Sequence, residues 1–304
     1  MEAFPPDLDR MRPTFDLQSH SIHSDGTLPA PDVVAHAARA GVRLLALSDH
    51  DTTDGVPEAR AAAREHGIAL SPAAELSAVH GPYEDLHVLG YELDPHDADL
   101  RAALHDFRGD RARRIEQMAE RLRALGFALD DAPLAARRAA GKPIGRPHLA
   151  DAVLAHPANA ARLRAEGIDG RDSLFPPYLV PGAAAYVARS RPTVAEAIDV
   201  IHAAGGVAVW AHPFWDLDDT AETLETLGAF IAAGLDGVEC FYPSHTEEQT
   251  HALFEAASGR LTTGSADFHG PGHERFNAFR AFDLFGLEPN LGPIGQSWTR
   301  SAPV

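Results

Sequence analysis

The stretch Asp16-Leu17-Gln18-Ser19-His20-Ser21-Ile22-His23-Ser24-Asp25-Gly26 decides how the rest of the chain is interpreted. A short apolar run ends there in histidine, acidic and small polar residues, and the pattern returns at Ser48-Asp49-His50-Asp51. A buried strand whose tip carries chemistry has this pattern, because only the body of the strand packs into a core. Gln18 and His20 are two residues apart on the first predicted strand, so both side chains point to the same face.

Strands and helices alternate along most of the chain. The pattern predicts seven strands, at residues 14–18, 43–47, 69–74, 87–91, 207–211, 237–241 and 261–264. Pro31 suits the first position of one intervening helix, and Thr193-Val194-Ala195-Glu196 is a capping box that opens another. In a parallel α/β barrel the carboxyl ends of all strands meet on one face, where active sites lie. We therefore expect an α/β fold, a seven-stranded barrel interrupted by a helical insertion.

The alternation stops after residue 97. Apolar residues then recur at steps of three and four from Leu100 to Leu125, which predicts a long amphipathic helix within a helical segment that ends near Val180. The predicted organisation is a discontinuous barrel of residues 1–97 and 183–304 with an insertion at 98–182. Residues 101–146 carry eleven Lys or Arg against six Asp or Glu. This basic character fits either a solvated helix face or a lid over an acidic, metal-bearing barrel.

The composition limits the possible partners. The 304 residues carry a net charge of −18, which should repel duplex nucleic acid and anionic membranes. Cys240 is the single cysteine, so the chain has no disulfide framework, as expected in a reducing cytoplasm. No apolar run approaches the roughly 20 residues of a membrane span, and the N-terminus lacks the apolar core of a signal peptide. We expect a cytoplasmic protein.

Nearly every predicted strand ends beside a residue that can bind a metal. The candidate ligands are Gln18, His20, Asp25, His50, Glu75, His87, His212, Asp267 and His269. Neutral imidazoles together with carboxylates suit Zn²⁺, Mn²⁺ or Fe²⁺. The set is too large for one ion of four to six ligands, so the sequence predicts two or three divalent ions, with Glu75 as a possible bridge.

Clustered divalent ions favour one chemistry. They lower the pKa of a bound water and stabilise both the attacking and the leaving oxygen of an in-line displacement, as in phosphoester hydrolysis. In Gly145-Arg146-Pro147-His148, Arg146 and His148 are candidates for substrate binding, because arginine can bind phosphate through two hydrogen bonds. His245 is a candidate phosphate contact or proton donor. For both Arg146 and His245, a surface position at the start of a helix is the alternative interpretation.

These motifs resemble the PHP (polymerase and histidinol phosphatase) family of metal-dependent phosphoesterases. The resemblance covers nearly the whole chain and depends on residues 16–26, on 48–51, on Glu75, His87 and 211–213, and on 264–269. It implies a distorted seven-stranded (β/α) barrel with a di- or trinuclear metal site. The insertion resembles that of a stand-alone branch containing nucleoside 3′,5′-bisphosphate phosphatases and 5′-phosphate-trimming nucleases. In that branch, residues matching Arg146 and His245 contact the substrate phosphate.

The chain departs from the family pattern at two places. The first family motif is usually Asp-Leu-His-x-His, and Gln18 stands where its first histidine is expected. An amide oxygen is a weaker ligand than imidazole, and His23 is a candidate to compensate. Relatives also carry Gly-Lys-Pro before the Tyr-Val that matches Tyr186-Val187, whereas this chain has Gly182-Ala183-Ala184-Ala185.

We therefore expect a metal-dependent phosphoric ester hydrolase. His20, Glu75 and Asp267, with Gln18 possible, would bind one ion; Glu75, His87 and His212 a second; and Asp25, His50 and His269 a third. A metal-bridging hydroxide would attack phosphorus, with His212, Arg146 and His245 as the catalytic residues. The expected substrate is a small phosphate ester, namely a nucleotide with a 3′,5′-bisphosphate or a 5′-phosphate end. The alternatives are a phosphatase for histidinol phosphate or another small phosphomonoester, and a catalytically silent protein that binds a metal or nucleotide.

Overall fold

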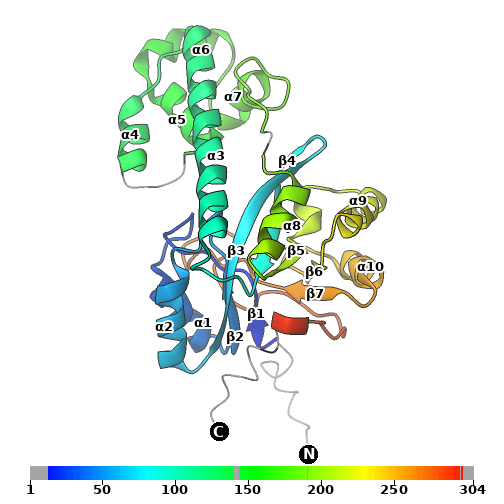
Figure 1. The fold of residues 1–304 in the computed structure, drawn as a ribbon. Coiled ribbons are helices and arrows are strands. Elements are labelled where there is room, and N and C mark those ends of the chain that lie inside the picture. Colours follow the sequence, from blue (N-terminus) through cyan, green and yellow to red (C-terminus); the bar gives the residue numbers. More distant parts are fainter. Residues whose placement is uncertain (1–12, 140–143, 190, 295, 297–304) are drawn as a thin grey trace, which may run out of the picture. The chain divides into compact units, whose positions relative to one another are not determined.

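The computed structural model describes residues 13–139, 144–189, 191–294 and 296. By compactness the chain divides into two units, Met1–His105 with Pro192–Val304, and Asp106–Arg191 (Figure 1). The long predicted helix is α3 (Ala98–Ala124), which begins in the first unit and continues into the second. The domain boundaries at 98 and 182 stay predictions.

The first unit is built around one seven-stranded sheet in which the strands follow one another in chain order. The strands are β1 (Phe15–Asp16), β2 (Leu44–Leu47), β3 (Ala69–His80), β4 (Tyr83–Tyr91), β5 (Val207–Trp210), β6 (Gly237–Phe241) and β7 (Leu261–Gly264). Beyond β1 and β7 the two ends of the sheet meet, because the Leu17 N–H donates to the Gly264 carbonyl at 3.2 Å and the His20 N–H to the Phe268 carbonyl at 2.8 Å. The sheet is therefore a nearly closed barrel, which confirms the predicted fold class.

Strand β4 runs against its neighbours, so the barrel is not all parallel. It pairs antiparallel with both β3 and β5, whereas the other neighbouring strands are parallel. The reversal follows from a tight turn at Gly81-Pro82, where Gly81 has φ +54°. Strand β3 also runs past its predicted end at residue 74 to His80. In consequence His87 lies opposite Ser77, in the middle of β4, and not at the first residue of that strand as predicted.

Helices connect the strands of the barrel. They are α1 (Ala30–Arg39), α2 (Val56–His66), α8 (Val194–Ala203), α9 (Thr220–Ala232) and α10 (Glu247–Ala257), with the 3₁₀ turn η3 (Pro213–Trp215). The predicted capping box at Thr193 is confirmed, since its hydroxyl accepts the Glu196 N–H at 3.2 Å and the Glu196 carboxylate accepts the Thr193 N–H at 2.8 Å. Val33 and Val34 of α1 and Ala59 of α2 are fully buried in an apolar cluster beside β2.

The second unit is helical. Besides the rest of α3, it contains α4 (Asp131–Ala139), α5 (Arg146–Ala155), η2 (Pro157–Asn159), α6 (Ala160–Ala165) and α7 (Arg171–Tyr178). Met118, Leu122 and Leu174 are fully buried in its own apolar core. The Arg162 guanidinium lies 3.8 Å from the centre of the Phe127 ring, so a charged side chain covers the edge of that core.

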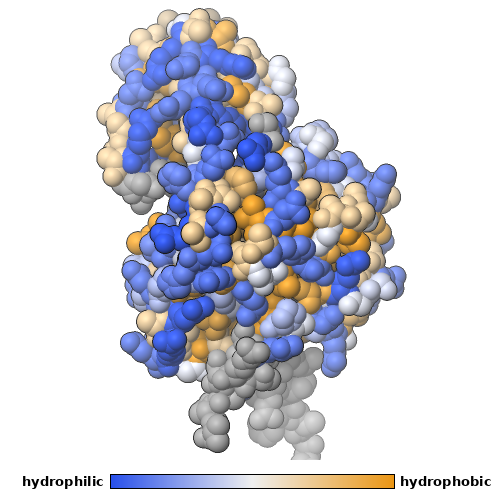
Figure 2. Space-filling view, viewed as in Figure 1, coloured by the Kyte–Doolittle hydropathy of each residue, from blue (hydrophilic) through white to orange (hydrophobic). Residues whose placement is uncertain are grey.

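The surface is mostly hydrophilic in the face shown in Figure 2, with hydrophobic residues visible around α8 and α9. No helix in the described part of the chain is long and apolar enough to cross a membrane.

Candidate metal centre

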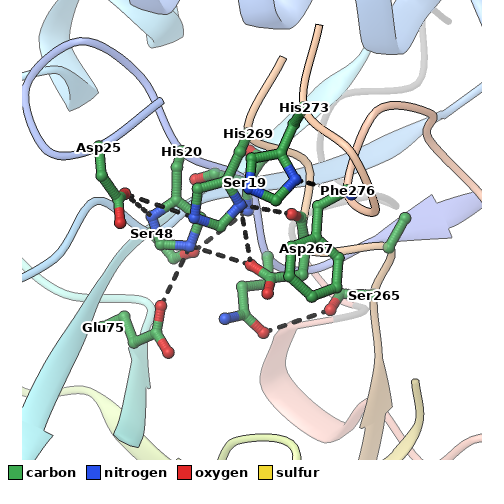
Figure 3. Close-up of polar contacts among 12 residues, drawn as sticks. Ser19, His20, Asp25, Ser48, Glu75, Ser265, Asp267, His269, His273 and Phe276 are labelled. Atoms are coloured by element: carbon green, nitrogen blue, oxygen red, sulfur yellow. Dashed lines mark hydrogen bonds and ion pairs between the residues drawn. The ribbon is translucent and has the colours of Figure 1, made fainter. Parts of the chain in front are cut away.

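Glu75 is the centre of a histidine cluster inside the barrel. It lies on β3 and is fully buried. Its Oε1 is 2.9 Å from His87 Nδ1 and 3.2 Å from His212 Nε2. Its Oε2 is 3.1 Å from His20 Nε2 and 3.5 Å from His50 Nδ1. One carboxylate thus faces four imidazoles from separate parts of the chain, and Figure 3 shows Glu75 aimed at His20.

A second carboxylate group adjoins the first. Asp25 lies 3.5 Å from His20 Nδ1, 3.5 Å from His50 Nε2 and 3.4 Å from His269 Nε2. Asp267 Oδ1 lies 3.2 Å from His20 Nε2, and the His20 and His269 rings are stacked with centroids 4.2 Å apart (Figure 3). Residues more than 240 positions apart therefore meet in one cluster, as the sequence predicts for the end of a barrel.

The donor set fits divalent ions. Ligand atoms of His20, Asp25, His50 and His269 lie within 4.8 Å of one another, as do those of His50, Glu75 and His87. Five buried atoms of the cluster make no well-formed hydrogen bond among the described residues: His20 Nε2, His50 Nδ1, Glu75 Oε2, His212 Nδ1 and Asp267 Oδ1. Four of them face one another only in ion-pair contacts of 3.1 to 3.5 Å, His20 Nε2 with Glu75 Oε2 and Asp267 Oδ1, and His50 Nδ1 with Glu75 Oε2. Buried polar atoms without well-formed hydrogen bonds are costly, so this set of atoms is suited to hold a shared ligand. A cation coordinated by them would meet that need.

The electrostatics of the cluster favour cations. Burial by itself raises the pKa of the Glu75 carboxyl, but His50, His87 and the hydrogen-bonding imidazoles around it hold that pKa well below its usual range. For His20, burial acts to lower the pKa, and the carboxylates of Asp267 and Glu75 nevertheless raise it well above the ordinary value. Both shifts favour the charged form, an anionic Glu75 and a cationic His20, and a bound metal ion would replace the positive charge of that imidazole.

Asp49 holds the loop that carries Asp25. The Asp49 carboxylate accepts the Ser21 N–H, the Ser21 hydroxyl and the Ser24 hydroxyl, each at 2.7 Å. All three residues are buried. Gly26 closes the same loop, where a Cβ would overlap the carbonyl of His20. Asp49 thus positions candidate ligands without being one, a role that the sequence analysis did not identify.

Asp16 has the same role on the neighbouring strand β1. Its carboxylate accepts the N–H of Ala266 at 2.9 Å and that of Arg280 at 2.8 Å, which fixes the segment that leads into Asp267. Burial raises the pKa of Asp16 to about 7. Asp267 has φ +54° and His212 has φ +28°, in a region that side chains with a Cβ rarely adopt. Such strain is concentrated at functional sites.

Gln18 lies next to a buried carboxyl that the sequence analysis did not consider. The Ser265 hydroxyl lies 3.3 Å from Gln18 Oε1 and 2.6 Å from Glu239 Oε1. Glu239 also accepts the His212 N–H at 3.0 Å, and burial raises its pKa to about 8. His23, the predicted substitute ligand, is exposed and packs beside Gly55, 3.0 Å from the position of a Cβ there. The structure therefore does not bring His23 into the cluster.

The three candidate phosphate contacts lie in different settings. His245 is buried in the first unit, where its Nδ1–H donates to the Cys240 carbonyl at 2.9 Å and burial lowers its pKa to about 4. Its Nε2 therefore presents a lone pair and has no hydrogen bond in the described part of the chain. Arg146 begins α5 in the second unit, and His148 Nδ1 accepts the Gly145 N–H there at 3.0 Å. Their roles, and the division of the ligands among individual ions, stay predictions.

Comparison with known proteins agrees with this geometry. The model of the PHP domain matches residues 16–121. A 3′,5′-nucleoside bisphosphate phosphatase of Chromobacterium violaceum is 35% identical over 84% of this chain and 87% of its own length. A 5′-3′ exoribonuclease of Haemophilus influenzae is 31% identical over 86% and 92%. A solved structure from Bifidobacterium adolescentis, assigned as a metal-dependent phosphoesterase, has a TM-score of 0.67 at 28% identity, covering 96% of this chain and 98% of that one.

The same assignment is supported by the seven-stranded barrel, by the buried cluster of histidines and carboxylates, and by these relatives. The chain belongs to the PHP family, and it is a metal-dependent phosphoric ester hydrolase.

Proposed function

We propose that the enzyme removes a phosphate from a nucleoside 3′,5′-bisphosphate. The observation that supports this most directly is the cluster around Glu75, where carboxylates and imidazoles with buried atoms that lack well-formed hydrogen bonds form a site for divalent ions. The relative with 35% identity over most of both chains is a phosphatase for this class of nucleotide. A net charge of −18 also requires local positive charge wherever a doubly phosphorylated substrate binds.

The cofactors in this proposal are two or three divalent ions, Mn²⁺, Fe²⁺ or Zn²⁺. Glu75 and its four imidazole neighbours would hold one group of ions, and Asp25 with His269 would extend the site. When bound, the ions supply the positive charge that stabilises a phosphoryl group in its transition state. Asp49 and Asp16 keep the ligand-bearing segments in place through their backbone hydrogen bonds.

In this proposal, His245 of the first unit would accept a hydrogen bond from the substrate. Its ring is held between Phe214 and Tyr242, with centroids 5.3 and 5.4 Å away, and its Nδ1–H is fixed by the Cys240 carbonyl. This arrangement leaves one tautomer with a fixed orientation. A fixed neutral imidazole can position a phosphate hydroxyl or a water.

A second candidate function comes from the exoribonucleases, one of which is 31% identical over 86% of this chain. Such an enzyme would cleave a phosphodiester bond next to a 5′ end, not a terminal phosphomonoester.

A product analysis separates the two functions. The protein is incubated with Mn²⁺ and either adenosine 3′,5′-bisphosphate, a 5′-phosphorylated oligoribonucleotide or histidinol phosphate, and the products are identified by mass spectrometry. The proposal predicts adenosine monophosphate and inorganic phosphate from the bisphosphate, with faster turnover than the other two compounds. Release of mononucleotides from the oligoribonucleotide at a higher kcat/KM would instead assign the exonuclease activity. Release of phosphate from histidinol phosphate alone would contradict both.

A further inference from the structure

An exposed tryptophan stands beside the candidate metal centre. Three large hydrophobic side chains are exposed in the described part of the chain, Ile22, Leu125 and Trp215, and only Trp215 is aromatic, with 44% of its surface exposed. Its position follows from His212, which lies two residues after β5, has φ +28° and precedes the turn η3. The Trp215 N–H donates to the His212 carbonyl at 2.9 Å, and the two rings lie 6.4 Å apart.

Two further aromatic rings join Trp215 to the cluster. The Phe276 ring is 5.7 Å from that of Trp215 and 5.6 Å from that of His269. The Tyr242 ring is 6.5 Å from Trp215 and 5.9 Å from Phe276, and its hydroxyl donates to Asp267 Oδ2 at 2.8 Å. Figure 3 shows Phe276 next to Asp267. The three rings come from the segments after β5, β6 and β7 and make one continuous aromatic wall.

A cation lies on this wall. The Arg275 guanidinium carbon is 5.7 Å from the centre of the Trp215 ring, and Arg275 is exposed. An exposed π-face, a cation and a site for phosphate chemistry therefore adjoin one another in a chain of net charge −18. A ligand suited to all three has a planar ring and negative charge, separated by a short linker. A nucleotide has this composition, with its base and its phosphates joined through a ribose.

We propose that Trp215, supported by Phe276 and Tyr242, is the platform on which the nucleobase of the substrate stacks. This inference rests on the proposed function and deepens it, since it assigns the residue by which the enzyme prefers nucleotides to other phosphate esters. Every base has a π-face, so the platform selects for the presence of a base and tolerates different bases. Stacking acts equally on the bound substrate and its transition state, and therefore affects KM more than kcat.

The test compares two substrates that differ only in the base. They are adenosine 3′,5′-bisphosphate and its abasic analogue, 1-deoxyribose 3,5-bisphosphate, measured with Mn²⁺. Base stacking of typical strength predicts that wild type prefers the nucleotide by about 5- to 150-fold in kcat/KM. In Trp215→Ala this ratio should fall towards one, through a higher KM for the nucleotide. Trp215→Phe, which keeps a π-face, should restore most of the preference.

Leu125→Ala provides a matched control, because Leu125 is also an exposed hydrophobic residue but lies outside the aromatic wall. It should leave the ratio unchanged. A wild-type ratio near one, or an equal ratio in wild type and Trp215→Ala, overturns the stacking platform while leaving the phosphatase in place. Absence of turnover of both compounds by wild type overturns the proposed function itself. A misfolded Trp215→Ala protein is recognised by its circular dichroism, and Trp215→Phe against Trp215→Leu then provides the comparison.

Discussion

Replacing Asp49 tests whether the metal centre depends on a residue that does not belong to the donor set. Asp49→Ala removes the acceptor of three hydrogen bonds, each 2.7 Å long, from Ser21 and Ser24. Leaving a buried donor unsatisfied costs about 1–3 kcal/mol, so three donors put the expected loss at about 3–5 kcal/mol even when part of the loop relaxes towards water. A domain is typically stable by only about 5–15 kcal/mol.

The loss should appear in two measurements. Urea unfolding in the presence of EDTA gives the free energy of unfolding without the contribution of bound metal, and metal content after dialysis reports the state of the site. Asp49→Ala should be destabilised by about 3–5 kcal/mol and should retain less metal, because the loop it releases carries Asp25. Asp49→Asn keeps one acceptor for the Ser21 N–H and should lose about half as much.

Asp54→Ala is the matched control, since Asp54 is an exposed carboxylate in the loop that contains Asp49 itself. It should stay within about 0.5 kcal/mol of wild type. If Asp49→Ala and Asp54→Ala prove equally stable and bind equal amounts of metal, the assignment of Asp49 as the residue that positions this loop is wrong.

Further predictions concern the centre and the core. Glu75→Gln should lower metal content and reduce phosphate release at least about 100-fold, as measured by inductively coupled plasma spectrometry and a phosphate assay, because it removes the charge shared by four imidazoles. Gln18→His should bind Mn²⁺ about tenfold more tightly in a calorimetric titration, since imidazole replaces an amide; unchanged affinity would place Gln18 outside the donor set. Gly26→Ala should cost about 1–3 kcal/mol in urea unfolding, because its Cβ would overlap the His20 carbonyl. Burial raises the pKa of the Cys240 thiol, so a thiol reagent should label it only as the protein unfolds; fast labelling of the native protein would contradict its buried position.

The strand pattern predicts the barrel because each buried strand is a short apolar run that ends in polar residues. The expectation that the ligands lie at the carboxyl ends of parallel strands fails at His87. This residue contacts Glu75 from the middle of the antiparallel strand β4. The turn at Gly81-Pro82 is the local signal for that reversal. Periodicity alone could not reveal it, since an isolated strand has the same pattern in either direction.

The ligand set could be predicted in outline because its residue types are uncommon at the ends of buried strands. The supporting residues could not. Asp49 and Asp16 lie beside histidines within the same motifs, and only the path of the backbone decides which carboxylate faces the cluster and which accepts N–H groups. The role of Trp215 could not be predicted from the sequence, because its contacts with the rings of Tyr242 and Phe276 join three separate loops.

The central claim is that the cluster around Glu75 binds divalent ions, and that the enzyme needs these ions to hydrolyse a phosphate ester of a nucleotide. The most direct measurement is phosphate release from adenosine 3′,5′-bisphosphate by protein stripped with EDTA, before and after Mn²⁺ is restored. The account predicts negligible release from the stripped protein and recovery of at least about 100-fold with Mn²⁺. Release that is equally fast without metal, or that stays absent with Mn²⁺, Fe²⁺ and Zn²⁺ alike, would contradict it.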